Sequence, residues 1–328
     1  MVKHSCISLE SPLEWKEALK GIKHSFAHTW ENCYAMHRTT GFDTYLYFFE
    51  RDNIKIICPV AEREYNGYKD IVTPFGFSGF IGNKDFSEFK NYWNEFVQRK
   101  NYICGYISLN PAFQNESYFD KKESFQSTSI YFIDLKLSLT ELFENLDVNR
   151  KRQVKNYKKA EASFIYDRKI LTDFFVNNYY NFLKRINASD ANYFTLETLE
   201  FICSLENVFM VGAGKLDNIE AVYIFSFTDY EGGCMFNVAT EEGRRHSPSL
   251  LWCGLKFFRS KKIPLMNLGG GIIEGDNVAM SKQRFGAYKL PFINLKQVYD
   301  VNVYNKLCAE KNIDANDLNG YFPAYRKA

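Results

Sequence analysis

The stretch from Phe209 to Gly286 constrains the fold of this chain most, because three apolar runs there lead into a helix and then into a strand that ends in glycines. The apolar runs cover residues 209–213, 221–227 and 234–239, lengths that are typical of buried strands. The final strand ends at Leu268-Gly269-Gly270-Gly271. Because a helix among such strands buries its apolar side on a sheet, we expect an α+β fold.

The turn between the third run and the helix has the residue types of an anion-binding turn. Free N–H groups and the positive end of the helix dipole meet at a helix N-terminus, which favours phosphate groups. In this turn glycine would allow close backbone approach, arginines would supply charge, and Ser247 or Ser249 would cap the helix. The candidate residues are Gly243, Arg244, Arg245, His246, Ser247 and Ser249. A Ser-Pro helix start with solvent-facing arginines would give the same pattern, so the residues alone leave both interpretations open.

The length and the charge of the chain limit its class. A chain of 328 residues exceeds what one hydrophobic core usually serves, so two domains are expected. The net charge of +2 disfavours a general nucleic-acid binder. Residues 149–159 nevertheless carry six basic side chains and no acidic one. They form either a solvated helix face or a patch that meets phosphates.

The cysteines and the N-terminus predict a reducing, cytoplasmic location. The eight cysteines include no Cys-x-x-Cys pair and no nearby histidine cluster, so we expect no metal site. Cys58, Cys104 and Cys234 lie in apolar runs, where a reduced thiol packs as a small hydrophobic group. The N-terminus has no apolar signal core, and no stretch approaches the ~18 consecutive apolar residues of a membrane span.

Changes of periodicity divide the chain into two successive α+β parts. The first, residues 1–137, is expected to run from a helix at Pro12, through strands at 44–49 and 54–60, to a helix at 85–100 and strands at 103–109 and 129–135. Ser138 has the position of an N-cap and opens the second part, residues 138–300. Its expected elements before Phe209 are the basic helix, a strand at 164–166, and helices at 171–187 and 196–204.

Four stretches, in order along the chain, resemble the Fem-type acyltransferases, two-domain relatives of the GCN5-related N-acetyltransferases (GNAT). The first three are the aromatic-glycine turn Thr73–Gly79, the strand Ile107–Leu109 ending in Asn110-Pro111, and the basic segment Asn149–Ala160. The fourth combines the Gly243 turn, the glycine run Leu268–Gly271 and the spacing of Lys282, Phe285 and Gly286. The resemblance implies tandem GNAT-like domains, each a mixed, mostly antiparallel sheet flanked by helices. It also implies that residues 301–328 pack back on the first domain.

Acyl transfer from a thioester to an amine requires binding of the donor phosphates, stabilisation of the carbonyl oxygen and a neutral amine. The resemblance implies that Lys282 faces the reacting carbonyl or the acceptor phosphates, where its charge offsets developing negative charge. Arg284 and Lys289 could assist, and Asp276 could orient an amine or hydroxyl. Gly270, within the glycine run, would either expose backbone N–H groups to an anion or let the strand end pass close to a neighbour.

The first half supplies candidates for the acceptor. Phe75, Gly76 and Phe77 could stack on a base or sugar, or could form a core-facing loop, and Trp30 is a further candidate contact. His28 lies four residues after His24, so the two would share one helical face. His28 is therefore a candidate general base, or it merely belongs to the start of a helix.

The resemblance thus implies an acyl-CoA-dependent N-acyltransferase. Its donor would be a coenzyme A thioester, and its acceptor the amine of a nucleotide-linked amino sugar, for example a dTDP-amino-deoxy sugar, in cell-surface polysaccharide assembly. A second interpretation is transfer of an amino acid from aminoacyl-tRNA to a peptidoglycan precursor. The interval from Asp167 to Phe209 is too short for the long helical arm that many such enzymes carry, which favours coenzyme A. A non-catalytic GNAT-like binding protein remains a third interpretation.

Overall fold

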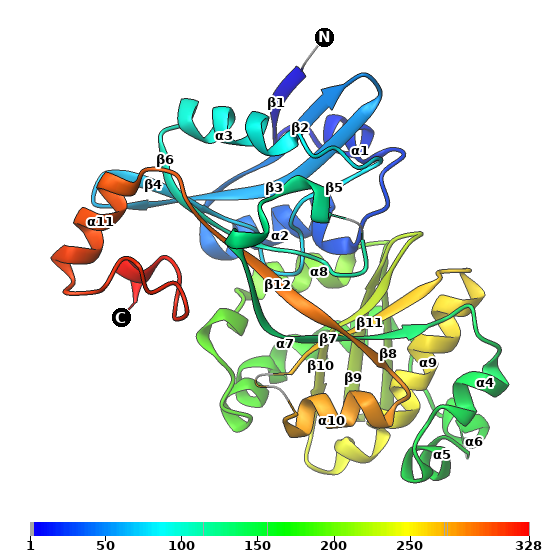
Figure 1. Ribbon diagram of the computed structural model, residues 1–328. Helices are drawn as coiled ribbons and strands as arrows, with labels where there is room; N and C mark the ends of the chain where they lie inside the picture. The colour runs from blue at the N-terminus through cyan, green and yellow to red at the C-terminus, as the bar shows by residue number, and fades with distance from the viewer. Residues whose placement is uncertain (1–2, 114, 156, 272, 274, 328) are drawn as a thin grey trace. The chain divides into compact units, whose positions relative to one another are not determined.

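The chain forms two compact units (Figure 1). The first unit contains the residues up to Thr128 and those from Pro291 onward, and the second contains Ser129–Leu290. The computed structural model describes residues 3–113, 115–155, 157–271, 273 and 275–327. The sequence suggested boundaries at 137 and 300, whereas both boundaries here fall inside long strands, β7 (Ser124–Asp134) and β12 (Tyr288–Val298). Strand periodicity does not mark such positions, because the hydrogen-bonded strand continues through them.

The first unit contains a mixed sheet in the order β1-β2-β3-β4-β6-β12. Its further strands are β1 (Lys3–Ser8), β2 (Asp43–Arg51), β3 (Ile54–Tyr65), β4 (Tyr68–Val72), β5 (Ile81–Gly82), which pairs with β3, and β6 (Tyr102–Ser108). Neighbours in this order are antiparallel except β4 and β6. Asp52 and Asn53 have positive φ angles of 50° and 64°, the backbone that a two-residue hairpin between β2 and β3 requires.

Helices cover both faces of this sheet. They are α1 (Pro12–Leu19), α2 (Trp30–Thr40), α3 (Phe89–Arg99) and α11 (Val301–Glu310). Side chains alternate along β2, so that Tyr47 packs with Trp93 of α3 while Phe48 packs with Trp15 of α1. Trp15, Trp93 and many other aromatic side chains of the chain are buried in the core in this way.

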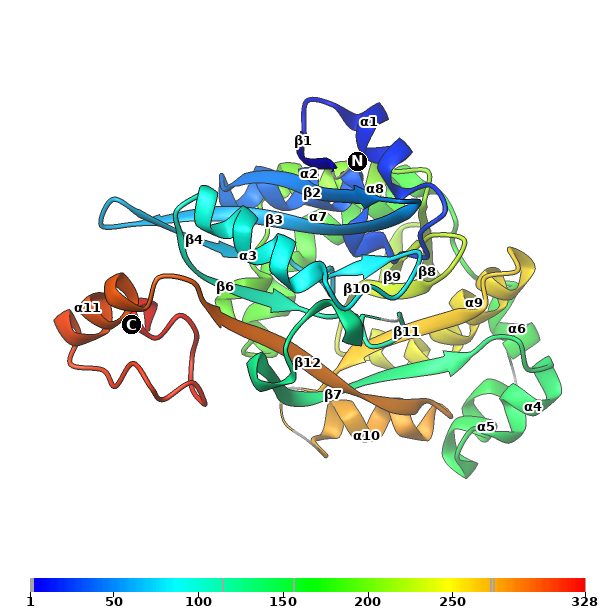
Figure 2. The same ribbon diagram turned by 45° about the horizontal axis from the view of Figure 1, so that its top comes forward.

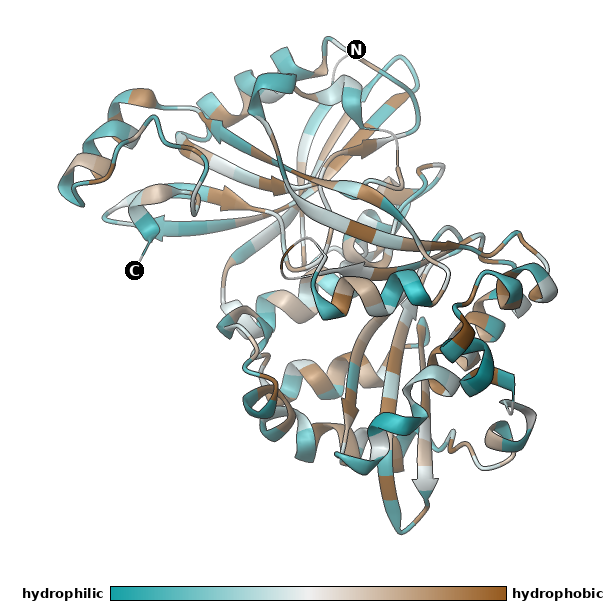
Figure 3. Ribbon diagram, turned by 60° about the horizontal axis from the view of Figure 1, so that its bottom comes forward, coloured by the Kyte–Doolittle hydropathy of each residue, from teal (hydrophilic) through white to brown (hydrophobic). Residues whose placement is uncertain are grey.

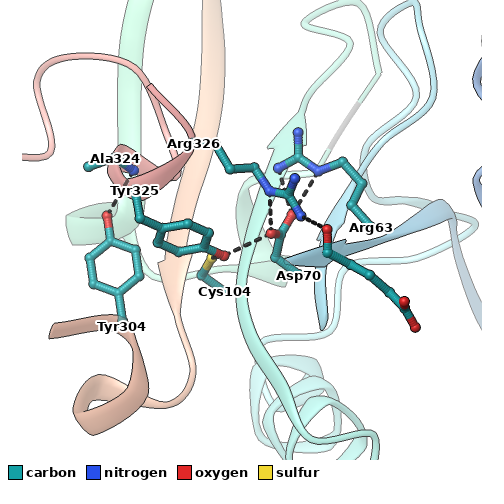
Figure 4. Close-up of polar contacts among 8 residues, drawn as sticks. Arg63, Asp70, Cys104, Tyr304, Ala324, Tyr325 and Arg326 are labelled. Carbon is teal, nitrogen blue, oxygen red and sulfur yellow. Dashed lines mark hydrogen bonds and ion pairs between the residues drawn. The ribbon is translucent and has the colours of Figure 1, made fainter. Parts of the chain in front are cut away.

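The segment after β12 is fastened to the first unit through Asp70, a fully buried carboxylate on β4. Figure 4 shows Asp70 between Arg63 and the C-terminal residues Tyr325 and Arg326. Arg63 approaches Asp70 Oδ1 at 2.6 Å, and the Tyr325 hydroxyl and Arg326 Nε each donate to Oδ2 at 2.7 Å. Both carboxylate oxygens are thus satisfied, which a buried charge requires. Figure 2 shows α11 and the loop after it, in orange to red, beside β6.

The second unit contains a sheet in the order β7-β11-β10-β9-β8. Its further strands are β8 (Val208–Lys215), β9 (Asn218–Phe227), β10 (Gly232–Ala239) and β11 (Leu265–Gly270). Only the β10–β11 pair is parallel among the described pairings of this unit. Helix α9 (Ser247–Ser260) connects these two parallel strands, as a crossover connection must.

Both faces of the sheet in the second unit hold helices through apolar side chains, and Figure 3 shows many hydrophobic residues, in brown, along these strands. Helix α9 buries Leu250 and Phe258 against Phe225 of β9, and the opposite face receives α7 (Arg168–Arg185) through Phe175 and Phe236. The remaining helices are α4 (Leu139–Glu144), α5 (Val148–Lys155), α6 (Tyr157–Glu161), α8 (Leu196–Ser204) and α10 (Asn277–Arg284).

The expected fold class is confirmed, since each unit is a mixed, mostly antiparallel sheet flanked by helices. The strand expected at 164–166 is reduced to a single bridge between Ile165 and Gly212. Strand β1 was not anticipated, because residues 3–8 are too polar to give a strand pattern.

Within the described ranges, no helix combines the length and the apolar character needed to cross a bilayer. The same residues contain no group of three or more His, Cys, Asp or Glu side chains that could hold a metal ion.

Candidate active site

The hydrogen-bonded pairing between β10 and β11 covers only the start of β10. Beyond it, the two strands continue without described pairing to each other. The described ladder joins only Gly232 to Met266 and Gly233 to Asn267. Strand β10 continues to Ala239, bonded to β9 on its other side, and β11 continues to Gly270. Backbone groups beyond the ladder can accept an extended ligand that carries amides, in the way that a peptide adds to a sheet edge.

Lys282 lies at this end of the ladder. It comes from the last turn of α10, and its Nζ donates to the carbonyl oxygen of Gly270, the last residue of β11. Burial lowers the pKa of Lys282 to about 8, and the nearby Cys234 of β10 and Asp276 oppose this shift. Burial also raises the pKa of the Cys234 thiol to about 12, so the thiol is neutral at pH 7. Lys282 therefore holds a partly desolvated positive charge that no thiolate neutralises.

Asp276 and Arg284 lie at the two ends of α10. Asp276 is the N-cap of the helix, and its carboxylate accepts the N–H groups of Ala279 at 2.7 Å and of Ile273 at 3.2 Å. From the start of the same helix, the negative charge of Asp276 raises the pKa of Lys282 and so partly offsets the effect of burial. Arg284 is more than half exposed and its Nε lies 3.7 Å from Asp147 Oδ2. The structure thus brings Lys282, Asp276 and Gly270 together, with Arg284 at the far end of the helix.

The arginines of the expected phosphate-binding turn are paired with carboxylates of the second unit. The turn is a 3₁₀ segment, Glu242–His246, that leads directly into α9. Arg245 donates to both oxygens of Glu220, at 3.1 and 2.8 Å, and His246 Nε2 lies 2.9 Å from Glu220 Oε2. Arg244 lies 2.9 Å from Glu241. Because the Arg244 and Arg245 side chains are 55% and 65% exposed, these pairs are weak and an incoming phosphate can displace them.

Gly243 has a packing role in this turn. A Cβ atom at Gly243 would lie 2.0 Å from the carbonyl oxygen of Glu220, so only glycine fits against β9 there. Its N–H donates to Thr240 Oγ1 at 3.0 Å. The N–H of Gly243 is therefore already hydrogen-bonded within the turn.

The prediction that Ser247 or Ser249 caps this helix is wrong. His246 occupies the N-cap position and makes no side-chain capping bond, while Ser247 and Ser249 are the first and third residues of α9. The 3₁₀ segment continues into the helix without a break, and the N–H of Ser247 bonds to the carbonyl of Arg244. The first turn of α9 is therefore partly satisfied by backbone groups, and a side-chain cap is not required.

In the first unit, the aromatic-glycine turn is held rigidly by buried polar side chains. Asn32 donates to the carbonyl of Phe75 at 3.1 Å, and His28 Nε2 lies 3.2 Å from the carbonyl of Gly79. Gly76 has a φ of +114°, and a Cβ there would lie 2.8 Å from that of Ala27. Glycine is therefore required at position 76, because both its φ angle and the close contact with Ala27 disfavour a side chain there.

The two aromatic residues of this turn differ in exposure. Phe75 is 43% exposed, whereas Phe77 packs edge-on against Phe292 with ring centroids 4.9 Å apart. Phe75 is thus the side chain of the turn that a ligand ring can reach. Trp30, the first residue of α2, donates Nε1 to the carbonyl of Leu9 at 2.7 Å and stacks on Tyr34 at 4.7 Å.

The interpretation of His28 as a general base is corrected by its surroundings. The residue lies in a 3₁₀ turn, Phe26–His28, rather than on a helical face shared with His24, and its side chain is fully buried. Nδ1 lies 2.9 Å from Ser25 Oγ, and Nε2 faces Gly79. Burial, together with the charge of His24, lowers the pKa of His28 to about 3. A neutral, fully buried ring with both nitrogens engaged holds the turn and is not placed to accept a proton from a substrate in solvent.

The sequence interpretation missed two buried polar residues beside the glycine run, Asn267 and Glu231. Asn267 Oδ1 accepts the N–H of Gly269 at 2.7 Å, and Asn267 Nδ2 donates to Glu231 Oε1 at 3.3 Å. An asparagine two residues before a glycine is a turn signal that was available in the sequence.

No family profile matches the sequence, and no curated protein matches it. Solved structures do resemble it. The crystal structure of FemX superposes with a TM-score of 0.69 at 9% identity, covering 93% of this chain and 99% of FemX.

Two further similar structures come from Agrobacterium fabrum and Bacillus licheniformis. The first is the C-terminal domain of a putative lysylphosphatidylglycerol synthetase, with a TM-score of 0.58 at 12% identity and coverage of 92% of this chain and 96% of that one. The second, L-PGS, has a TM-score of 0.58 at 9% identity, with coverage of 89% and 94%. At these identities the likeness concerns the fold, and the Fem-type fold expected from the sequence motifs is confirmed over nearly the whole chain.

Proposed function

We propose that this chain is an N-acyltransferase that moves an acyl group from an activated carrier to an amine. The observation that supports this most is the partly buried ammonium of Lys282 at the end of the β10–β11 ladder. With a pKa of about 8, Lys282 is roughly nine-tenths protonated at pH 7. A preorganised cation in a partly desolvated position stabilises the oxyanion that forms when an amine attacks an acyl carbonyl.

Each other residue of the site has a role in positioning. The open edges of β10 and β11 would bind an extended acyl carrier through backbone hydrogen bonds. The carbonyl of Gly270 holds the Lys282 ammonium in place. The negative charge of Asp276 favours the protonated form of Lys282. The Cys234 thiol is neutral and Asp276 accepts backbone N–H groups as the N-cap of α10, so we assign neither as a general base, and the acceptor amine would lose its proton to water.

For the finer assignment we propose a coenzyme A thioester as donor and a nucleotide-linked amino sugar as acceptor. Arg244 and Arg245 would bind the donor phosphates after release from Glu241 and Glu220. Within the first unit, the exposed Phe75 is a candidate surface on which a base or sugar ring could stack.

One observation favours the second candidate, an aminoacyl-tRNA donor. The intact pairs of Arg244 and Arg245 leave the turn without a free cation, whereas α5 presents exposed basic side chains, Arg152 and Lys155. Such a helix suits a long polyanion better than a single diphosphate.

A direct assay distinguishes these candidates. Purified protein is incubated with acetyl-CoA and a panel of dTDP- and UDP-linked amino sugars while thiol release is followed, and in parallel with aminoacyl-tRNA and a peptidoglycan precursor. Lys282→Ala should lower turnover well over tenfold, whereas the exposed control Lys155→Ala should leave turnover with acetyl-CoA unchanged. Arg244→Ala combined with Arg245→Ala should raise the apparent KM for acetyl-CoA.

The outcomes separate the alternatives. Unchanged turnover in Lys282→Ala would remove this lysine from the mechanism. Turnover with aminoacyl-tRNA alone would establish the second donor. Absence of transfer in every arm, with ligand binding retained, would support a binding protein.

A further inference from the structure

Strand β11 is bulged immediately before the residue that holds Lys282. Its register with β7 runs regularly to the pair Asn267–Phe132, but the next pair is Gly270–Ile130. Three residues on β11 thus span two on β7, and Gly269 within this bulge has a φ of +74°. Bulges with a left-handed glycine redirect the backbone groups that follow them.

The side chain of Asn267 fixes this bulge. Its Oδ1 accepts the N–H of Gly269 at 2.7 Å, which closes a turn over two residues. Its Nδ2 donates to the carboxylate of Glu231 at 3.3 Å. The amide oxygen of Asn267 thus faces a donor, and the amide nitrogen faces an acceptor. Only one orientation of the Asn267 side chain satisfies both bonds. Asn267 and Glu231 are each 6% exposed, and therefore water does not readily replace either bond.

The bulge and Lys282 are in direct contact. The carbonyl of Gly270, one residue after the bulged glycine, accepts from Lys282 Nζ. A Cβ atom at Gly269 would lie 3.4 Å from the same Nζ. The direction of the Gly270 carbonyl, and with it the depth at which the ammonium sits, depends on the conformation of Gly269.

We propose that Asn267 and Glu231 are positioning residues for Lys282. Glu231 orients the amide of Asn267, Asn267 holds Gly269 in its left-handed conformation, and the Gly270 carbonyl then retains the Lys282 ammonium in the partly buried position beside Cys234 and Asp276. This inference concerns the site of the proposed transferase and rests on that function for its catalytic meaning. The effect of these two buried residues on the surroundings of Lys282 does not depend on any substrate.

The test is an exchange of the two side chains. In Asn267→Asp, a carboxylate oxygen faces Glu231 where an N–H group did, so the two repel each other and the bulge is released. In the double variant Asn267→Asp with Glu231→Gln, the new carboxylate accepts both from the N–H of Gly269 and from the new amide that replaces its partner. The chain of hydrogen bonds is thereby restored. Glu231→Gln alone keeps an acceptor for Asn267 and is the matched control.

The readout is the pH at which Lys282 becomes reactive. The intact protein, without donor or acceptor, is treated with acetic anhydride across pH 6–11, and acetylation of Lys282 is quantified by mass spectrometry of its peptide. The midpoint should lie near 8 in the wild type and in Glu231→Gln. It should rise by more than about one pH unit in Asn267→Asp, toward the ordinary lysine value, and return in the double variant.

Two further results decide the remaining cases. A folded Asn267→Asp protein with a wild-type midpoint, or a double variant that is not restored, would overturn the proposal. If Asn267→Asp does not fold, Asn267→Ala, which loses the acceptor for Gly269 without adding charge, should show the same rise, and an unchanged midpoint there would also overturn it. Because the labelling uses no acyl acceptor, a failed transferase assay does not affect this result. Where transfer is measurable, Asn267→Asp should lower kcat with little change in the donor KM.

Discussion

Replacement of Lys282 by methionine should stabilise the protein at neutral pH. Burial lowers the pKa of Lys282 from its ordinary 10.5 to about 8. Between these values the unfolded chain binds a proton that the folded chain does not, so the free energy of unfolding of the wild type rises with pH across the interval. Below pH 8 the whole cost of keeping this charge partly buried is present. A difference of about 2.5 pH units corresponds to about 3 kcal/mol.

Methionine has a similar length but carries no charge, so Lys282→Met removes this cost. It also removes the hydrogen bond to the Gly270 carbonyl, which is worth about 1 kcal/mol. The net expectation is a gain of about 2 kcal/mol in the free energy of unfolding at pH 7. The gain should fall to near zero at pH 9.5, because there the wild type has recovered about 2 kcal/mol by releasing the proton.

Urea unfolding followed by circular dichroism at pH 7.0 and pH 9.5 measures both values. The control is Lys155→Met on α5, an exposed lysine, which should change stability by less than about 0.5 kcal/mol at either pH. If Lys282→Met destabilises the protein, or if its effect is the same at both pH values, then Lys282 does not carry a desolvated charge.

Three further expectations follow from described contacts. Gly243→Ala should destabilise the second unit by several kcal/mol, because the added Cβ would lie 2.0 Å from the Glu220 carbonyl oxygen; a loss below about 1 kcal/mol in urea unfolding would show that the turn can move. Arg326→Met leaves the fully buried Asp70 with one arginine, which should cost about 3–5 kcal/mol and lower the melting temperature by calorimetry; an unchanged melting temperature would mean that Arg63 suffices. If Lys282 acts as an ammonium ion, kcat should fall as the pH rises through about 8, whereas a rise would indicate a neutral amine acting as a base.

The sequence predicted the parts of the fold that local patterns determine. The apolar runs between Phe209 and Ala239 are strands, and the amphipathic pattern after Pro248 is a helix, because burial on a sheet demands those periods. The boundaries of the units could not be found in this way. They lie inside β7 and β12, and a continuous strand has no local sign of a change in neighbours.

The site was predictable only where its residues are close in the chain. Lys282 was identified through the resemblance to the Fem-type enzymes, by its place downstream of the glycine run, and its bond to Gly270 joins two residues twelve positions apart. By contrast, the pairing of Arg245 with Glu220 depends on the register of β9 against β10, which the sequence does not reveal. The position of His28 was misjudged because an i,i+4 spacing suggests a helix, whereas the chain there makes only a 3₁₀ turn.

The attachment of Tyr325 and Arg326 to Asp70 has a consequence for biosynthesis. The second unit is one uninterrupted stretch, Ser129–Leu290, so it can acquire its structure as soon as that stretch has emerged from the ribosome. The first unit cannot be completed at that point, because Asp70 has Arg63 but lacks Tyr325 and Arg326, and the sheet lacks β12, until translation has passed Arg326. The amino-terminal half is therefore completed last, after the stretch that follows it in the chain has been synthesised.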